Sequence, residues 1–291
     1  MHTPHTAPLP VVFSNNMVGF SDSFSPSAEK PAKVVADWHN AGLPLEIVEP
    51  VPATEADLAR AHSLDFVRGV LDCSLANGFG NRSPSVAAAL PYTSGAMLTG
   101  ARLALQRGGA VCAPCSGFHH AGWRMGGGFC TFNGLIVTAQ ALLVAGEARR
   151  VLILDCDQHY GDGTDEIIER LDLADRVEHF TAGDRFTSPY QVPEFFRTLP
   201  RILAETEADV VLYQAGADPH CNDPLGGWMT TAQLRERDAI VFEAARARAL
   251  PLVWNLAGGY QRDPSGGIAP VLEIHRNTAL EHLRVFGGAG A

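Results

Sequence analysis

Four side chains that could bind a metal ion or transfer protons lie within eight residues of one another. Asp155, Asp157, His159 and Asp162 follow the apolar run Val151–Leu154, in the stretch LDCDQHYGDG. Charged groups beside a buried segment are costly to desolvate unless a partner compensates them. Asp157 and His159 are two residues apart, so an extended backbone directs both side chains to one face. The spacing therefore predicts a metal site.

Polar side chains of the same kinds follow three other strand-like segments: His119 and His120 after 110–112, Asp218 after 210–214, and Tyr260 after 252–256. Each has a simpler structural explanation on its own, because a carboxylate can cap a helix and Gly-Gly-Tyr can form a turn. In open α/β sheets, however, ligands gather at the carboxyl ends of the strands. The shared position of all four groups favours one functional site.

Asp157, His159 and Asp218 together offer two carboxylate oxygens and one imidazole nitrogen. Three protein ligands leave a coordination position open, which is typical of catalytic zinc, although Fe(II) and Mn(II) accept similar ligands. The chain has six cysteines and one CxxC pair, Cys112 and Cys115. A lone pair of this kind is weak evidence for a metal or redox site, and we interpret it as part of a buried strand.

Short apolar runs alternate with longer helical patterns along the chain. We predict strands at Val11–Phe13, Leu45–Val48, Ala110–Cys112, Val151–Leu154, Val177–Phe180, Val210–Gln214 and Leu252–Leu256. Helices are expected at 28–40, 55–74, 94–107, 133–146, 163–171, 192–207, 231–248 and 268–284, and loops at 14–27, 75–93, 183–191 and 219–230. Thr230 and Gln233 have capping-box spacing. The alternation predicts a single α/β domain over 1–291, with three α-β-α layers and a mostly parallel sheet.

The composition describes a globular protein with a substantial core, since 46% of the residues are hydrophobic and 19% are charged. A formal charge of −10 disfavours nucleic-acid binding. The first ten residues show no leader pattern, and no apolar run is long enough to span a bilayer. We therefore expect a cytoplasmic protein that binds neither membranes nor nucleic acid. The sequence leaves its oligomeric state open.

The chain resembles the zinc-dependent histone deacetylase-like amidohydrolases of the arginase/deacetylase superfamily, including bacterial members. Four blocks carry the resemblance in the family's order: GFHHAGWRMGGGFCTFNG (117–134), LDCDQHYGDGT (154–164), AGADPHCNDPLGG (215–227) and LAGGYQRD (256–263). The Phe before the paired histidines and the GGGFC run are most similar to the class IV branch. Tyr160 and Gly134 depart from the family's usual residues.

The resemblance assigns roles by position. It implies that Asp157, His159 and Asp218 hold one zinc ion. His119 and His120 match tandem histidines backed by Asp155 and Asp162, and Tyr260 matches the tyrosine that polarises the scissile carbonyl. Gly128 and Phe129 match the wall of the substrate tunnel. A structural potassium ion is expected among Asp155, Asp157, His159, Thr181 and Ala182, with the backbone carbonyls of 157 and 159 as ligands.

The function implied is hydrolysis of an acylated amine by metal-activated water, with acyl-lysine in proteins as the first substrate class. Family members with peptide substrates carry an acidic rim residue, whereas no carboxylate lies between Gly80 and Ala101. Acetylpolyamines and other small acylated amines therefore stay open as the alternative. A binuclear manganese enzyme is disfavoured because its DxHxD pattern is absent here. A catalytically silent scaffold is disfavoured because every catalytic position is retained. The acyl-chain preference cannot be inferred from the sequence.

Overall fold

The computed structural model describes residues 7–288. Residues 1–6 and 289–291 lie outside this range. The prediction that the first ten residues show no leader pattern therefore falls largely on residues that are not described. Within residues 7–288, seven strands form one sheet in the order β2-β1-β3-β7-β6-β4-β5, and every pair of neighbours is parallel. The strands are β1 (Leu9–Val12), β2 (Leu45–Val48), β3 (Ala110–Ser116), β4 (Val151–Asp155), β5 (Val177–Thr181), β6 (Val210–Gln214) and β7 (Leu252–Leu256).

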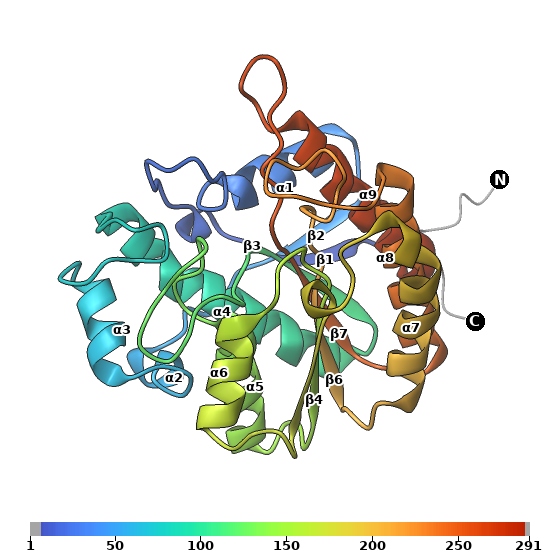
Figure 1. The fold of residues 1–291 in the computed structure, drawn as a ribbon. Coiled ribbons are helices and arrows are strands. Elements are labelled where there is room, and N and C mark those ends of the chain that lie inside the picture. Colours follow the sequence, from blue (N-terminus) through green and yellow to red (C-terminus); the bar gives the residue numbers. More distant parts are fainter. Residues whose placement is uncertain (1–6, 289–291) are drawn as a thin grey trace.

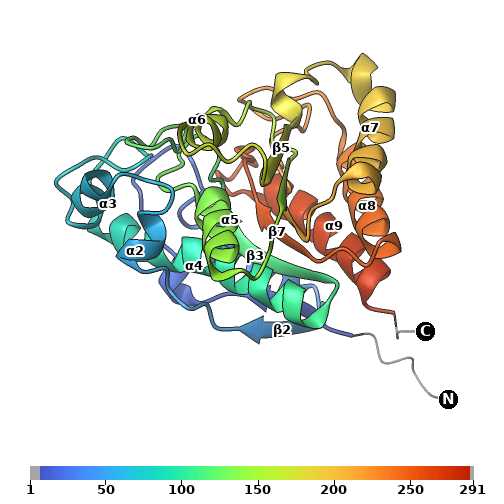
Figure 2. The ribbon, with the colours of Figure 1, turned by 90° about the horizontal axis from the view of Figure 1, so that it is seen from below.

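Helices cover both faces of this sheet (Figures 1 and 2). On one side lie α2 (Glu55–Leu58), α3 (Leu64–Leu71), α4 (Pro84–Arg107), α5 (Gly134–Ala145) and α6 (Asp162–Arg170). On the other lie α1 (Lys30–Asn40), α7 (Val192–Glu205), α8 (Thr231–Ala247) and α9 (Ala269–Phe286). The predicted three-layer α/β fold is thereby confirmed. Among the described residues, no helix is both long and apolar enough to cross a bilayer.

The strand sequences explain why both faces are covered. Successive side chains of a strand point to opposite faces, and here both sets are apolar. In β4, Leu152 and Leu154 join the core beneath α7 and α8, whereas Val151 and Ile153 join the core beneath α4 and α5. Cys112 and Cys115 are buried within β3, as the interpretation of the CxxC pair expected.

The predicted helix at 94–107 and the predicted loop at 75–93 are both partly wrong. Helix α4 begins ten residues earlier, at Pro84. Ser83 caps it by accepting a hydrogen bond from the Val86 amide, and proline is favoured in the first turn. The helix continues through Pro91, whose carbonyl accepts a hydrogen bond from Ala53. The helix is continuous from Pro84 to Arg107 although Pro91 lies inside it.

The single helix predicted at 55–74 is divided in the structure. Thr54 and Asp57 form a capping box at the start of α2, and a second cap, Ser63, starts α3. His62 lies at the break and is buried. Other predicted elements shift by only a few residues, and the capping box of Thr230 and Gln233 is confirmed.

Candidate metal centre and active site

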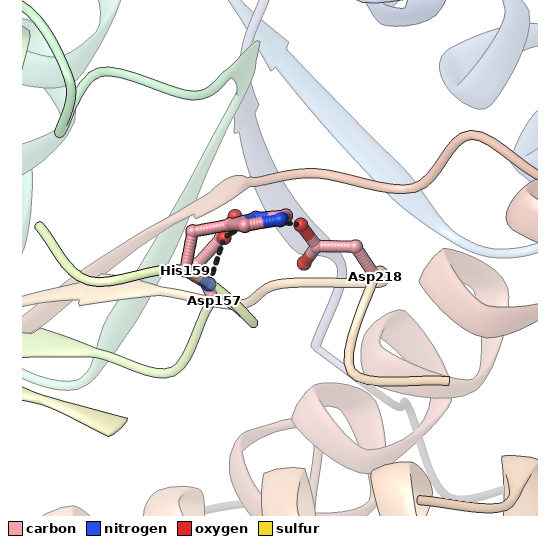
Figure 3. Close-up of side chains that lie close together, drawn as sticks. All are labelled: Asp157, His159 and Asp218. Carbon is pink, nitrogen blue, oxygen red and sulfur yellow. Dashed lines mark hydrogen bonds and ion pairs between the residues drawn. The ribbon is translucent and has the colours of Figure 1, made fainter. Parts of the chain in front are cut away.

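The three predicted metal ligands meet at the carboxyl ends of two neighbouring strands. Asp157 and His159 follow β4, and Asp218 follows β6, which pairs with β4 along its length. Each residue offers one ligand atom, and these atoms lie within 4.8 Å of one another. Figure 3 shows the three side chains pointing toward a common point. His159 Nδ1 lies 3.2 Å from an oxygen of Asp157 and 3.1 Å from an oxygen of Asp218.

The charges around this point favour a bound cation. Burial and the neighbouring Asp157 raise the pKa of Asp218 to about 7. Hydrogen bonds to Asp157 and Asp218 raise the pKa of His159 to about 10. Two buried carboxylates thus draw a positive charge onto the one imidazole between them. Two carboxylate oxygens and an imidazole nitrogen are a donor set that suits a divalent transition metal.

His119 forms a buried pair with Asp155. Its Nδ1 donates to Asp155 Oδ2 at 2.7 Å, and both side chains are at most 3% exposed. Its Nε2 lies 3.6 Å from an oxygen of Asp157, so the ring faces the metal ligands. Burial lowers the pKa of His119, but the carboxylates of Asp155 and Asp157 outweigh it and raise the value to about 9. These carboxylates therefore favour the protonated form of the His119 ring, whose charge Asp155 balances.

His120 forms a more exposed pair with Asp162. Its Nδ1 donates to Asp162 Oδ1 at 2.6 Å, with the two side chains 23% and 63% exposed. The rings of His119 and His120 lie 4.1 Å apart between centroids. Burial and the charge on His119 lower the pKa of His120, which keeps this ring neutral. Asp162 is the first residue of α6, and Gly161 is the N-cap, so Asp162 does not serve as the cap.

Tyr260 follows β7 and lies near Asp218 and Asp157. Its ring packs between Phe129, with centroids 5.4 Å apart, and Phe24, at 6.1 Å. Burial and the nearby carboxylates of Asp218 and Asp157 raise its pKa, so the phenol keeps its proton and can donate a hydrogen bond. The contacts with Phe24 and Phe129 thus fix the side chain of Tyr260, and its hydroxyl stays available as a donor.

Two residues missed by the sequence analysis hold the turn that carries this tyrosine. Asp223 accepts a hydrogen bond from the Tyr260 amide at 2.8 Å. Lys30 is fully buried, and its Nζ donates to the carbonyl of Gly258. Burial lowers the pKa of Lys30 to about 8, against the opposing effect of Asp218. Asp223 lies within a family block, but Lys30 beside Glu29 has the pattern of an exposed helix start.

Gly128 lies beside His120, and the neighbouring Phe129 packs against Tyr260. Gly128 has a φ of +52°, and a Cβ there would come within 2.4 Å of the His120 ring. Only glycine fits so close to that ring. Phe129 has a φ of +66°, a strained value for a bulky residue. A groove of about 530 Å³ opens on this side, lined by Gly128, His120, Asp162, Trp123, Arg124 and Met125.

The residues expected at a potassium site are also neighbours. Asp155 pairs with Thr181 across β4 and β5, and Ala182 follows directly. The segment after Thr181 packs against the His159 carbonyl, because a Cβ at Gly183 would lie 2.4 Å from that oxygen. The Thr181 hydroxyl accepts a hydrogen bond from the Gly161 amide.

The fold and the site define an α/β protein with a candidate metal-binding triad and two histidine–carboxylate pairs at the carboxyl edge of a parallel sheet. The family model described as "Histone deacetylase domain" matches residues 26–181 and 179–270. This covers well over half of the chain, which therefore belongs to the histone deacetylase domain family.

The individual relatives share about a third of their residues or fewer with this chain. Histone deacetylase 2 of Arabidopsis thaliana is 28% identical over 78% of this chain and 66% of its own length. Acetylpolyamine amidohydrolase of Mycoplana ramosa is 31% identical over 52% of this chain and 51% of its own length. The crystal structure of the HDA15 HD domain superposes with a TM-score of 0.74 at 20% identity, covering 98% of this chain and 90% of that one. This last similarity supports the fold.

Proposed function

We propose that the protein is a zinc-dependent hydrolase that removes an acetyl or longer acyl group from an amine, with acyl-lysine in proteins as the first substrate class. One observation carries the proposal: Asp157, His159 and Asp218 converge within 4.8 Å beside two histidine–carboxylate pairs. Family membership and the named relatives support it. Fe(II) remains the competing metal, because the same three ligands suit it.

Bound zinc would supply Lewis-acid activation of a water molecule and of the amide carbonyl. Residues of the chain would transfer the protons and stabilise the developing charge. His120 is neutral and faces solvent, so its Nε2 accepts the proton of the attacking water and later passes it to the leaving amine. Asp162 holds the opposite nitrogen. His119, charged and buried, stabilises the negative charge that develops on the substrate.

Tyr260 completes the site by donating a hydrogen bond from its hydroxyl to the developing oxyanion. Packing of its ring between Phe24 and Phe129 fixes this donor before the reaction begins. A donor that needs no reorganisation is worth roughly 3–4 kcal/mol in the transition state. Gly128 and Phe129 form the wall along which the substrate chain enters.

Acetylpolyamines and other small acylated amines are the second candidate substrates. The named amidohydrolase relative and the net charge of −10 favour this class. The absence of a carboxylate between Gly80 and Ala101 removes the rim residue that would hold a peptide backbone.

A kinetic screen separates the two substrate classes. Zinc-loaded protein is assayed with acetyl-lysine peptides, longer acyl-lysine peptides and acetylpolyamines, and these are ranked by kcat/KM. Activity on none of them would reject the proposed function. Asp218→Ala serves as the metal control, since it should lose bound zinc as well as turnover. Elemental analysis of the same samples tests the potassium site proposed at Asp155, Asp157, His159, Thr181 and Ala182.

A further inference from the structure

Asp155 is held by more groups than the pairing with His119 requires. Its Oδ2 accepts a hydrogen bond from His119 at 2.7 Å and also lies 3.9 Å from Nε2 of His179. Its Oδ1 accepts a hydrogen bond from the side-chain amide of Gln214 at 2.8 Å and one from the Asp157 backbone N–H at 3.1 Å. Two imidazoles therefore flank one oxygen of this buried carboxylate. The second imidazole belongs to none of the family blocks.

His179 is itself anchored from the far side. Its Nδ1 donates to Asp165 Oδ1 at 2.7 Å, and the Tyr160 hydroxyl donates to Asp165 Oδ2 at 2.6 Å. The His179 side chain is 3% exposed, whereas Tyr160 is 42% exposed. Within residues 7–288, Nε2 of His179 has no hydrogen-bond partner, and it faces Asp155. The contacts thus run from the surface to the catalytic pair.

The local structure brings these groups together. His179 lies on β5, two positions before the partner of Asp155 in the neighbouring strand β4. Asp165 lies in the first turn of α6. A Cβ at Gly161 would come within 2.9 Å of Asp155 Oδ2 and 3.0 Å of the His179 ring, so glycine there leaves room for the two side chains to approach. Tyr160, a departure from the family's usual residue, gains a structural explanation from its bond to Asp165.

We propose that Tyr160, Asp165 and His179 form a support chain that fixes the orientation of Asp155 and, through it, of His119. The residues of this support chain are positioning residues, because their side chains contact one another and Asp155 and make no hydrogen bond to Asp157, His159 or Asp218. The His179 ring lies within ion-pair distance of Asp155 Oδ2, at 3.9 Å, and limits the rotation of this carboxylate, which in turn orients the His119 ring through their hydrogen bond. The kinetic part of this inference rests on the proposed function.

The test uses zinc-loaded protein with Asp165→Asn and Tyr160→Phe. Outer-shell partners of metal-site groups typically contribute 10–100-fold. We expect kcat to fall by about tenfold in Asp165→Asn and by less in Tyr160→Phe, with KM and zinc content unchanged in both. Tyr190→Phe is the matched control, since this tyrosine is 94% exposed, and its kcat should equal that of the wild type.

A double-mutant cycle shows whether the effect passes through Asp155. In an Asp155→Asn background, Asp165→Asn should cause less than about twofold further loss of kcat, because coupled residues do not act additively. A full tenfold loss in that background would mean that Asp165 acts by another route and would overturn the support chain.

A second readout does not depend on activity. In protein with 15N-labelled histidine rings, the Nδ1–H resonance of His119 is assigned by its disappearance in His119→Gln. This resonance should shift in Asp165→Asn and stay in place in Tyr190→Phe. An unchanged resonance would reject the support chain even if the wild type proved inactive. Loss of activity toward every acylated amine would reject only the proposed function.

Discussion

The two histidine–carboxylate pairs share the same chemistry but differ in burial. The inner pair, His119 with Asp155, is at most 3% exposed, whereas the outer pair, His120 with Asp162, is 23% and 63% exposed. Buried carboxylates raise the pKa of the inner imidazole, while burial beside that charge lowers the pKa of the outer one. Identical residue types thus acquire different protonation preferences from their surroundings, and the proposed mechanism uses this difference: His119 supplies a charge, and His120 exchanges protons.

Replacing each histidine in turn is the strongest test of the different roles proposed for the two pairs. His120→Gln removes the group that accepts a proton, so we expect kcat to fall about 100–10,000-fold. His119→Gln should cost less, because it removes a stabilising charge but no proton transfer. Both variants should retain zinc, which elemental analysis checks alongside steady-state kinetics. A larger loss in His119→Gln than in His120→Gln would reverse the assignment of the two pairs.

Replacing the carboxylates should separate the pairs by stability. Asp155→Asn breaks a buried charged pair, so the free energy of unfolding should fall by about 3–5 kcal/mol. Asp162→Asn alters a pair whose carboxylate is 63% exposed, and exposed pairs contribute at most about 1 kcal/mol. Urea denaturation of both variants at one pH measures the difference. Equal losses would show that burial does not distinguish the pairs.

A third histidine sharpens the comparison, because His62 is buried without a carboxylate. Its Nδ1 donates to the Gly122 carbonyl and its Nε2 accepts from the Asn133 amide, each at 2.8 Å. Burial lowers the pKa of His62 to about 4. The neutral ring fits this site, and protonation of Nε2 would destroy the bond from Asn133.

The buried neutral ring of His62 makes the stability of the protein depend on pH. The unfolded chain binds a proton at this histidine below pH ~6.5, and the folded chain does so only near pH 4, so stability is lost as the pH falls through this window. The loss amounts to about 3 kcal/mol. The free energy of unfolding, measured by urea denaturation between pH 4 and 7, should change less with pH in His62→Gln than in His39→Gln, a control at an exposed histidine. An identical pH dependence of the free energy of unfolding in the two variants would exclude His62 as the source of this effect.

The smallest expected effect concerns turnover in the outer pair. Asp162→Asn leaves His120 in place but weakens its orientation, so kcat should fall about tenfold. The loss should be smaller than that of His120→Gln, measured with the same acylated amine. A loss as large as that of the histidine variant would make Asp162 an equal partner in proton transfer.

The sequence by itself determined the class of fold and most of the site. Doubly apolar runs such as Val151–Leu154 require cover on both faces, which predicts a parallel sheet between helices. Polar groups after several strands then converge, because parallel strands end at one edge. Helix boundaries were less predictable, since the continuation of α4 through Pro91 depends on packing against distant segments.

Only the tertiary structure decided what surrounds each charge. Lys30 and Glu29 look alike as exposed helix residues, yet Lys30 is buried beneath Gly258. In the sequence, His179 is a single polar residue in a predicted strand. It approaches Asp155 only because β5 lies beside β4 in the sheet. Spacing along a chain predicts which face a side chain takes. The neighbours that meet it there come from segments tens of residues away, and these neighbours set its burial, its pKa and its role.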